Sequence, residues 1–136
     1  MMATAGTLLS AAVTVLGVFL GLYTMMLVGR MRSKHAVDAP ATTGAPEFER
    51  AFRVQMNTQE NMLIFLPALW LFSIYVSPMW AGLLGVLWLI GRTHYAVSYA
   101  RSASERSLGF GVGLLAFGIL AIGAAIGVAI KIFAEL

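Results

Sequence analysis

The chain has 136 residues, of which 60% are apolar and only 11% are charged. Because so few polar side chains cannot cover a water-soluble globule of this size, the composition excludes a soluble domain and indicates a membrane protein. The formal net charge is +3, and the chain has no cysteine, which excludes a disulfide framework and a catalytic thiol from the protein itself.

Three stretches without a charged residue, 1–29, 61–91 and 107–130, are each long enough for a membrane-spanning helix, which needs about 20 mostly apolar residues. We divide the middle stretch at Ser77-Pro78, because proline removes a helical donor and restricts the residue before it. The sequence therefore predicts an all-α integral membrane fold. We expect a four-transmembrane-helix bundle in one domain, 1–136, with helices at about 4–32, 46–76, 79–101 and 106–133.

The first stretch lacks the basic start, the short apolar region and the cleavage site of a secretory signal, so we expect it to remain as a span. In a four-pass chain, one side of the membrane then receives eight of the nine basic residues: Arg30, Arg32, Lys34, Arg50, Arg53, Arg92, Arg101 and Arg106. Only Lys131 lies on the other side. The positive-inside rule places loops 30–46 and 100–106 in the cytoplasm and both termini on the opposite side.

The second predicted helix carries polar residues on one face. Arg50, Arg53, Asn57 and Glu60 follow one another at spacings of three, four and three residues, which places them on the same side of a helix. An ionised side chain in the bilayer costs about 2.5–3.5 kcal/mol, so charges retained at this depth suggest a functional site. The competing interpretation is an internal polar network that fixes the register of the helices.

The third predicted helix repeats the pattern at its far end. Arg92, Tyr95 and Tyr99 again share one face, and the following link brings Arg106 to a similar level. On spacing alone, the two tyrosines are equally well explained as aromatic residues of the membrane interface. Three segments nevertheless bring polar side chains to one layer near the cytoplasmic boundary.

The chemistry of this layer favours a small zwitterionic peptide as ligand. Arginine binds carboxylates with two parallel hydrogen bonds, glutamate suits an ammonium group, and amides suit peptide groups. The surrounding apolar helices would admit a second, lipophilic compound from the bilayer. We expect no metal site, because His35 and His94 have no third ligand at a suitable spacing, and we expect no nucleic-acid partner.

Two segments carry a family resemblance: PEFERAFRVQMNTQE at 46–60 and RTHYAVSYARS at 92–102. They resemble the MAPEG family, the membrane-associated proteins of eicosanoid and glutathione metabolism. Within it they are most similar to the branch of microsomal glutathione transferases and the leukotriene-forming synthase. The resemblance implies a homotrimer that binds glutathione between adjacent subunits.

The resemblance also implies roles for particular residues. Those expected to bind glutathione are Arg32, Arg53, Gln55, Asn57, Glu60, Arg92, Tyr95 and Tyr99, and Arg106 matches the arginine that activates the thiol. This chain departs from the family at two positions. Asn61 replaces a tyrosine that usually follows the glutamate, and Ser33 replaces an arginine of the leukotriene-forming synthase. The departure at Ser33 argues against a dedicated leukotriene synthase.

The sequence thus predicts a membrane glutathione transferase, active in detoxification, that conjugates the glutathione thiolate to lipophilic electrophiles, with lipid hydroperoxide reduction as a further activity. The alternative is a non-catalytic protein that binds a lipid and presents it to a partner, as one branch of the family does. A small transporter is less favoured, because the polar residues cluster at one boundary and do not cross the membrane midplane.

Overall fold

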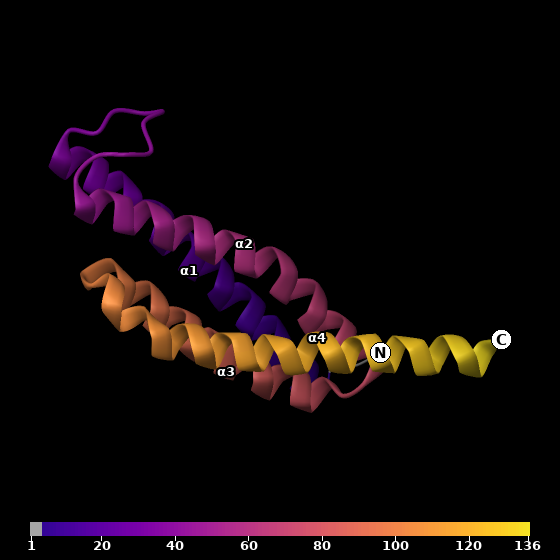
Figure 1. The fold of residues 1–136 in the computed structure, drawn as a ribbon. Coiled ribbons are helices and arrows are strands. Elements are labelled where there is room, and N and C mark those ends of the chain that lie inside the picture. Colours follow the sequence, from indigo (N-terminus) through magenta and orange to yellow (C-terminus); the bar gives the residue numbers. More distant parts are fainter. Residues whose placement is uncertain (1–3) are drawn as a thin grey trace.

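The computed structural model describes residues 4–136, which form four long α-helices and one short 3-10 helix. In chain order these are α1 (Ala5–His35), α2 (Pro46–Tyr75), α3 (Pro78–Arg101), η1 (Ala103–Arg106) and α4 (Ser107–Glu135). The helices run alternately up and down, so the α1–α2 loop and the α3–α4 link lie at the same end of the bundle (Figure 1). The predicted all-α four-helix fold is confirmed.

Local sequence signals define the helix ends. The Thr4 hydroxyl caps α1 by accepting a hydrogen bond from the Thr7 amide at 3.2 Å, and Pro46 and Pro78 occupy the first turns of α2 and α3. Helix α1 continues past residue 32, its predicted end, to His35. It ends there because Ala36 adopts a left-handed conformation and returns its N–H to the carbonyl of Arg32.

The two ends of the loop after α1 are joined to each other by one cluster of charged and polar side chains. Lys34 forms an ion pair of 2.6 Å with Glu47, and the ring of His35 lies 2.9 Å from the same carboxylate. The hydrogen bond from Lys34, and then that from His35, lower the pKa of Glu47 from its usual value. The contact is therefore intact at neutral pH and weakens only as the pH falls through this lowered pKa.

Helices α2 and α3 form the centre of the bundle, since each packs on all three of the other helices. The largest buried pair joins them: the rings of Phe65 and Trp88 stack at 3.7 Å with an angle of 5° between their planes. Val13 of α1 and Leu120 of α4 close the same core from either side. This packing fixes the rotation of α2 relative to α3. It therefore determines the direction in which the polar residues of the two helices face.

The surface has the character of a membrane protein. Among residues 4–136, Ala5–His35 and the continuous stretch Ala103–Glu135 are long and apolar enough to cross a bilayer. Large apolar side chains such as Leu63, Ile90 and Leu115 are more than half exposed, which water would disfavour but lipid would not. The C-terminal part of α4 extends beyond the other helices (Figure 1).

Candidate functional site

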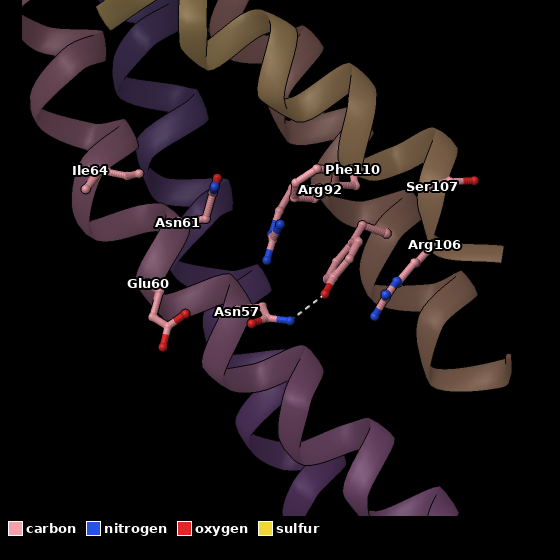
Figure 2. A pocket seen from close by; sticks show the side chains of 9 residues that line it. Asn57, Glu60, Asn61, Ile64, Arg92, Arg106, Ser107 and Phe110 are labelled. Atoms are coloured by element: carbon pink, nitrogen blue, oxygen red, sulfur yellow. Dashed lines mark hydrogen bonds between the residues drawn. The ribbon is translucent and has the colours of Figure 1, made fainter. Parts of the chain in front are cut away.

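A cavity of about 500 Å³ lies between α2, α3 and the beginning of α4, within the size range of small-molecule sites. Figure 2 shows the side chains that line it: Asn57, Glu60, Asn61 and Ile64 from α2, Arg92 and Tyr95 from α3, and Arg106, Ser107 and Phe110 from η1 and α4. Charged and amide groups occur on its walls together with Ile64 and Phe110. The cavity is therefore both polar and apolar.

Asn57 and Tyr95 connect α2 to α3 at the cavity. The Asn57 side-chain amide donates a hydrogen bond of 2.7 Å to the Tyr95 hydroxyl, drawn as the dashed line in Figure 2. This bond uses one of the donors of the amide and leaves the Asn57 carbonyl oxygen for another partner. Glu60, one turn further along α2, is exposed and adds a carboxylate to the same wall.

Arg92 is the buried cation of the site. Its residue is only 4% exposed, and its guanidinium lies 4.2 Å from the centre of the Tyr95 ring. In Figure 2 it extends into the space between α2 and α3. Within the part of the chain that the structure describes, its Nε and Nη2 have no hydrogen-bond partner. Because unpaired buried N–H groups are costly, this geometry suits an anionic group of a ligand.

Arg106 enters from the opposite wall. It ends η1, is exposed, and its guanidinium lies 5.1 Å from the centre of the Tyr99 ring. The Tyr99 and Tyr95 rings are in turn 5.5 Å apart. Each tyrosine thus supports one guanidinium through a cation–π contact, which limits the motion of a long and otherwise flexible side chain.

The structure brings together five of the nine predicted site residues as lining of this cavity, namely Asn57, Glu60, Arg92, Tyr95 and Arg106. Tyr99 adjoins it through Arg106.

The other three predicted residues do not line the cavity. Arg53 and Gln55 lie on α2 outside it. Arg32 is turned to its own loop, where its Nη1 donates to the carbonyl of Ala41 at 2.9 Å and its guanidinium lies 4.8 Å from the Phe48 ring.

Four lining residues were absent from the predicted set: Asn61, Ile64, Ser107 and Phe110. Helical spacing contains a signal for three of them. Asn61 is four residues after Asn57, Ile64 is four after Glu60, and Phe110 is four after Arg106, and such pairs share a helix face. No group of three His, Asp or Glu side chains within residues 4–136 is arranged to hold a metal ion.

Comparison with known proteins gives a consistent result. The model of the MAPEG family matches residues 10–126. An uncharacterized protein of Synechocystis is 48% identical over 84% of this chain and 83% of its own length. Human microsomal glutathione S-transferase 2 is 37% identical over 90% of this chain and 84% of its own length. Bovine leukotriene C4 synthase is 41% identical, with 83% and 81% covered.

Similarity of this extent covers the segments that form all four helices and the cavity. The family model alone matches all but the ends of the chain, and the relatives align over most of their own lengths. The all-α bundle and its apolar surface fit a membrane family. The chain therefore belongs to the MAPEG family of membrane proteins.

Proposed function

We propose that this protein is a membrane glutathione transferase that joins the glutathione thiolate to lipophilic electrophiles. The observation that carries the proposal is the buried guanidinium of Arg92, which lines one cavity with Glu60 and Arg106 and whose Nε and Nη2 find no hydrogen-bond partner among residues 4–136. Arg92 would bind a carboxylate of glutathione and Glu60 its ammonium group, which leaves Arg106 for the thiolate. The similarity to human microsomal glutathione S-transferase 2 supports the same ligand.

The proposed chemistry begins with the thiol. A free thiol has a pKa of about 8.5, and the thiolate is the nucleophile. Arg106 would stabilise this anion, and the thiol proton would leave to solvent. The sulfur then forms a bond to an electrophilic carbon, which releases a leaving group or transfers a π-electron pair to a neighbouring atom. Ile64 and Phe110 line the same cavity and would contact the apolar part of the electrophile.

We further propose four membrane passes, with the α1–α2 loop and the α3–α4 link in the cytoplasm. The positions of these links at one end of the bundle support it (Figure 1), together with the basic residues that they carry. We also propose a homotrimer. Arg32 and Gln55 lie outside the cavity of their own chain, so a neighbouring subunit would have to bring them to glutathione.

Conjugate formation tests the proposed function. Purified protein in detergent is incubated with glutathione and a lipophilic electrophile, and the thioether product is quantified by mass spectrometry above the uncatalysed rate. The proposal predicts product formation that saturates with glutathione. Binding of a lipid without any glutathione affinity or product would instead identify a non-catalytic lipid-binding protein.

Glu60→Gln tests how the ligand is oriented. If Glu60 holds the ammonium group, the substitution should weaken glutathione binding by about 10-fold or more, since a hydrogen bond to a charged group contributes roughly 1.5–3 kcal/mol. Isothermal titration with glutathione and with its N-acetyl derivative, which lacks the ammonium, measures the effect. The derivative should bind the wild type and the variant equally. An equal loss for both ligands would show that Glu60 does not contact the ammonium group.

A further inference from the structure

The side chain of Asn61 is held in one orientation by the core. The indole N–H of Trp88 donates a hydrogen bond of 2.7 Å to Asn61 Oδ1. Trp88 is completely buried and stacks on Phe65 at 3.7 Å, so this donor does not move. Because an indole N–H only donates, the oxygen of the Asn61 amide must face Trp88, and the nitrogen must point elsewhere.

The amide nitrogen of Asn61 is consequently available to the cavity. Asn61 lines the cavity and is only partly buried. Its Nδ2 makes no hydrogen bond to another described side chain. The atom is nevertheless not buried without a partner, so it is open to the cavity. The donor is thus both fixed and accessible, which is the arrangement needed to stabilise charge that develops during a reaction.

The position of Asn61 indicates what it meets. It stands on α2 between Asn57 and Glu60 on one side and Ile64 on the other, and Phe110 reaches the same cavity from α4. A lipophilic chain that lies against Ile64 and Phe110 would bring its polar, reactive end to Asn61. A neutral N–H donor at that point favours an electrophile that carries an oxygen acceptor.

We propose that Asn61 determines specificity for electrophiles that carry a carbonyl oxygen conjugated to the reactive double bond. This inference rests on the proposed transferase function. The thiolate sulfur forms a bond to the β-carbon, the π-electron pair of the double bond shifts, and negative charge collects on the carbonyl oxygen. The Asn61 N–H group donates to that oxygen. A proton from water then reaches the α-carbon, which completes the thioether.

A matched pair of substrates tests the inference. 2-Octenal is a conjugated aldehyde, whereas 1-iodooctane has a chain of the same length and no oxygen. The measured quantity is the ratio of kcat/KM for octenal to kcat/KM for iodooctane, which cancels changes in glutathione binding, thiolate formation and stability. Asn61→Leu should lower this ratio by about 10-fold or more, because a fixed donor to the developing oxyanion is lost.

Two further variants separate this role from a structural one. Asn61→Asp keeps an oxygen for the Trp88 N–H but removes the donor, so it should lower the ratio as Asn61→Leu does. Trp88→Phe keeps the amide but frees it to rotate, so its effect should be smaller, about 3-fold.

Equal losses for both substrates, with an unchanged ratio in Asn61→Leu and Asn61→Asp, would overturn the role of Asn61 and leave the transferase function intact. If the wild-type protein conjugated neither of the two substrates, both the inference and the function on which it rests would be overturned.

Discussion

Replacing Arg106 with alanine should reduce conjugation at pH 7 by about 10- to 30-fold, because a thiol of ordinary pKa, about 8.5, is only a few per cent ionised at that pH. The guanidinium is held at the cavity by its contact with Tyr99, 5.1 Å from the ring centre. Without it, the pKa of bound glutathione should return toward the value in water. The pH profile of kcat/KM measures this shift directly, because the variant should recover activity as the pH rises.

Two comparisons make the Arg106 result specific. Arg101→Ala removes a nearby exposed arginine that does not line the cavity, and it should leave the pH profile unchanged. Arg106→Lys keeps a positive charge and should retain part of the effect. If Arg106→Ala lowered kcat/KM equally at every pH, Arg106 would bind a substrate but would not ionise the thiol.

Replacing Gly109 with valine should separate α3 from α4 and disable the cavity between them. A Cβ at Gly109 would lie 2.5 Å from the Tyr95 amide nitrogen and 2.7 Å from the Gly91 carbonyl oxygen. These are backbone atoms of the neighbouring helix, so no side chain can move aside. Overpacking of this kind costs about 1–3 kcal/mol. The displaced segment carries Tyr95, so glutathione binding should fall together with the thermal unfolding temperature.

Gly111→Val is the matched control for Gly109→Val. It introduces the same side chain into the same helix two residues later, where a Cβ would meet no atom within 4 Å. Its unfolding temperature should remain close to that of the wild type. Thermal unfolding in detergent and glutathione titration measure both variants. Equal stability of the two variants would contradict the close packing of α3 on α4.

The fold was largely predictable from the sequence because its signals are local. Charge-free stretches mark the membrane-spanning helices, and the proline at position 78 divides the middle stretch into two. The MAPEG resemblance drawn from two short segments is confirmed by the match over residues 10–126. Helical spacing also grouped Asn57 with Glu60 and Arg92 with Tyr95, because each pair lies within one helix. The role assigned to each of these residues stays a prediction.

Contacts between helices could not be predicted in the same way. The hydrogen bond from Trp88 to Asn61 joins residues 27 positions apart, and it depends on how far α2 and α3 are rotated and shifted against each other. The stack of Phe65 on Trp88 sets that rotation. The loop carbonyls that accept from Arg32 likewise become neighbours only after the loop folds back. The spacing of residues along one helix contains no information on these contacts between separate segments.

The central claim is that the cavity binds glutathione as a thiolate. The most direct test is the ultraviolet difference spectrum of glutathione added to the wild-type protein in detergent at neutral pH, read in the thiolate absorption band. We predict a band that saturates at one thiolate for each occupied site. Absence of the band, with no glutathione bound in parallel equilibrium dialysis, would contradict the transferase function; binding without the band would contradict activation of the thiol.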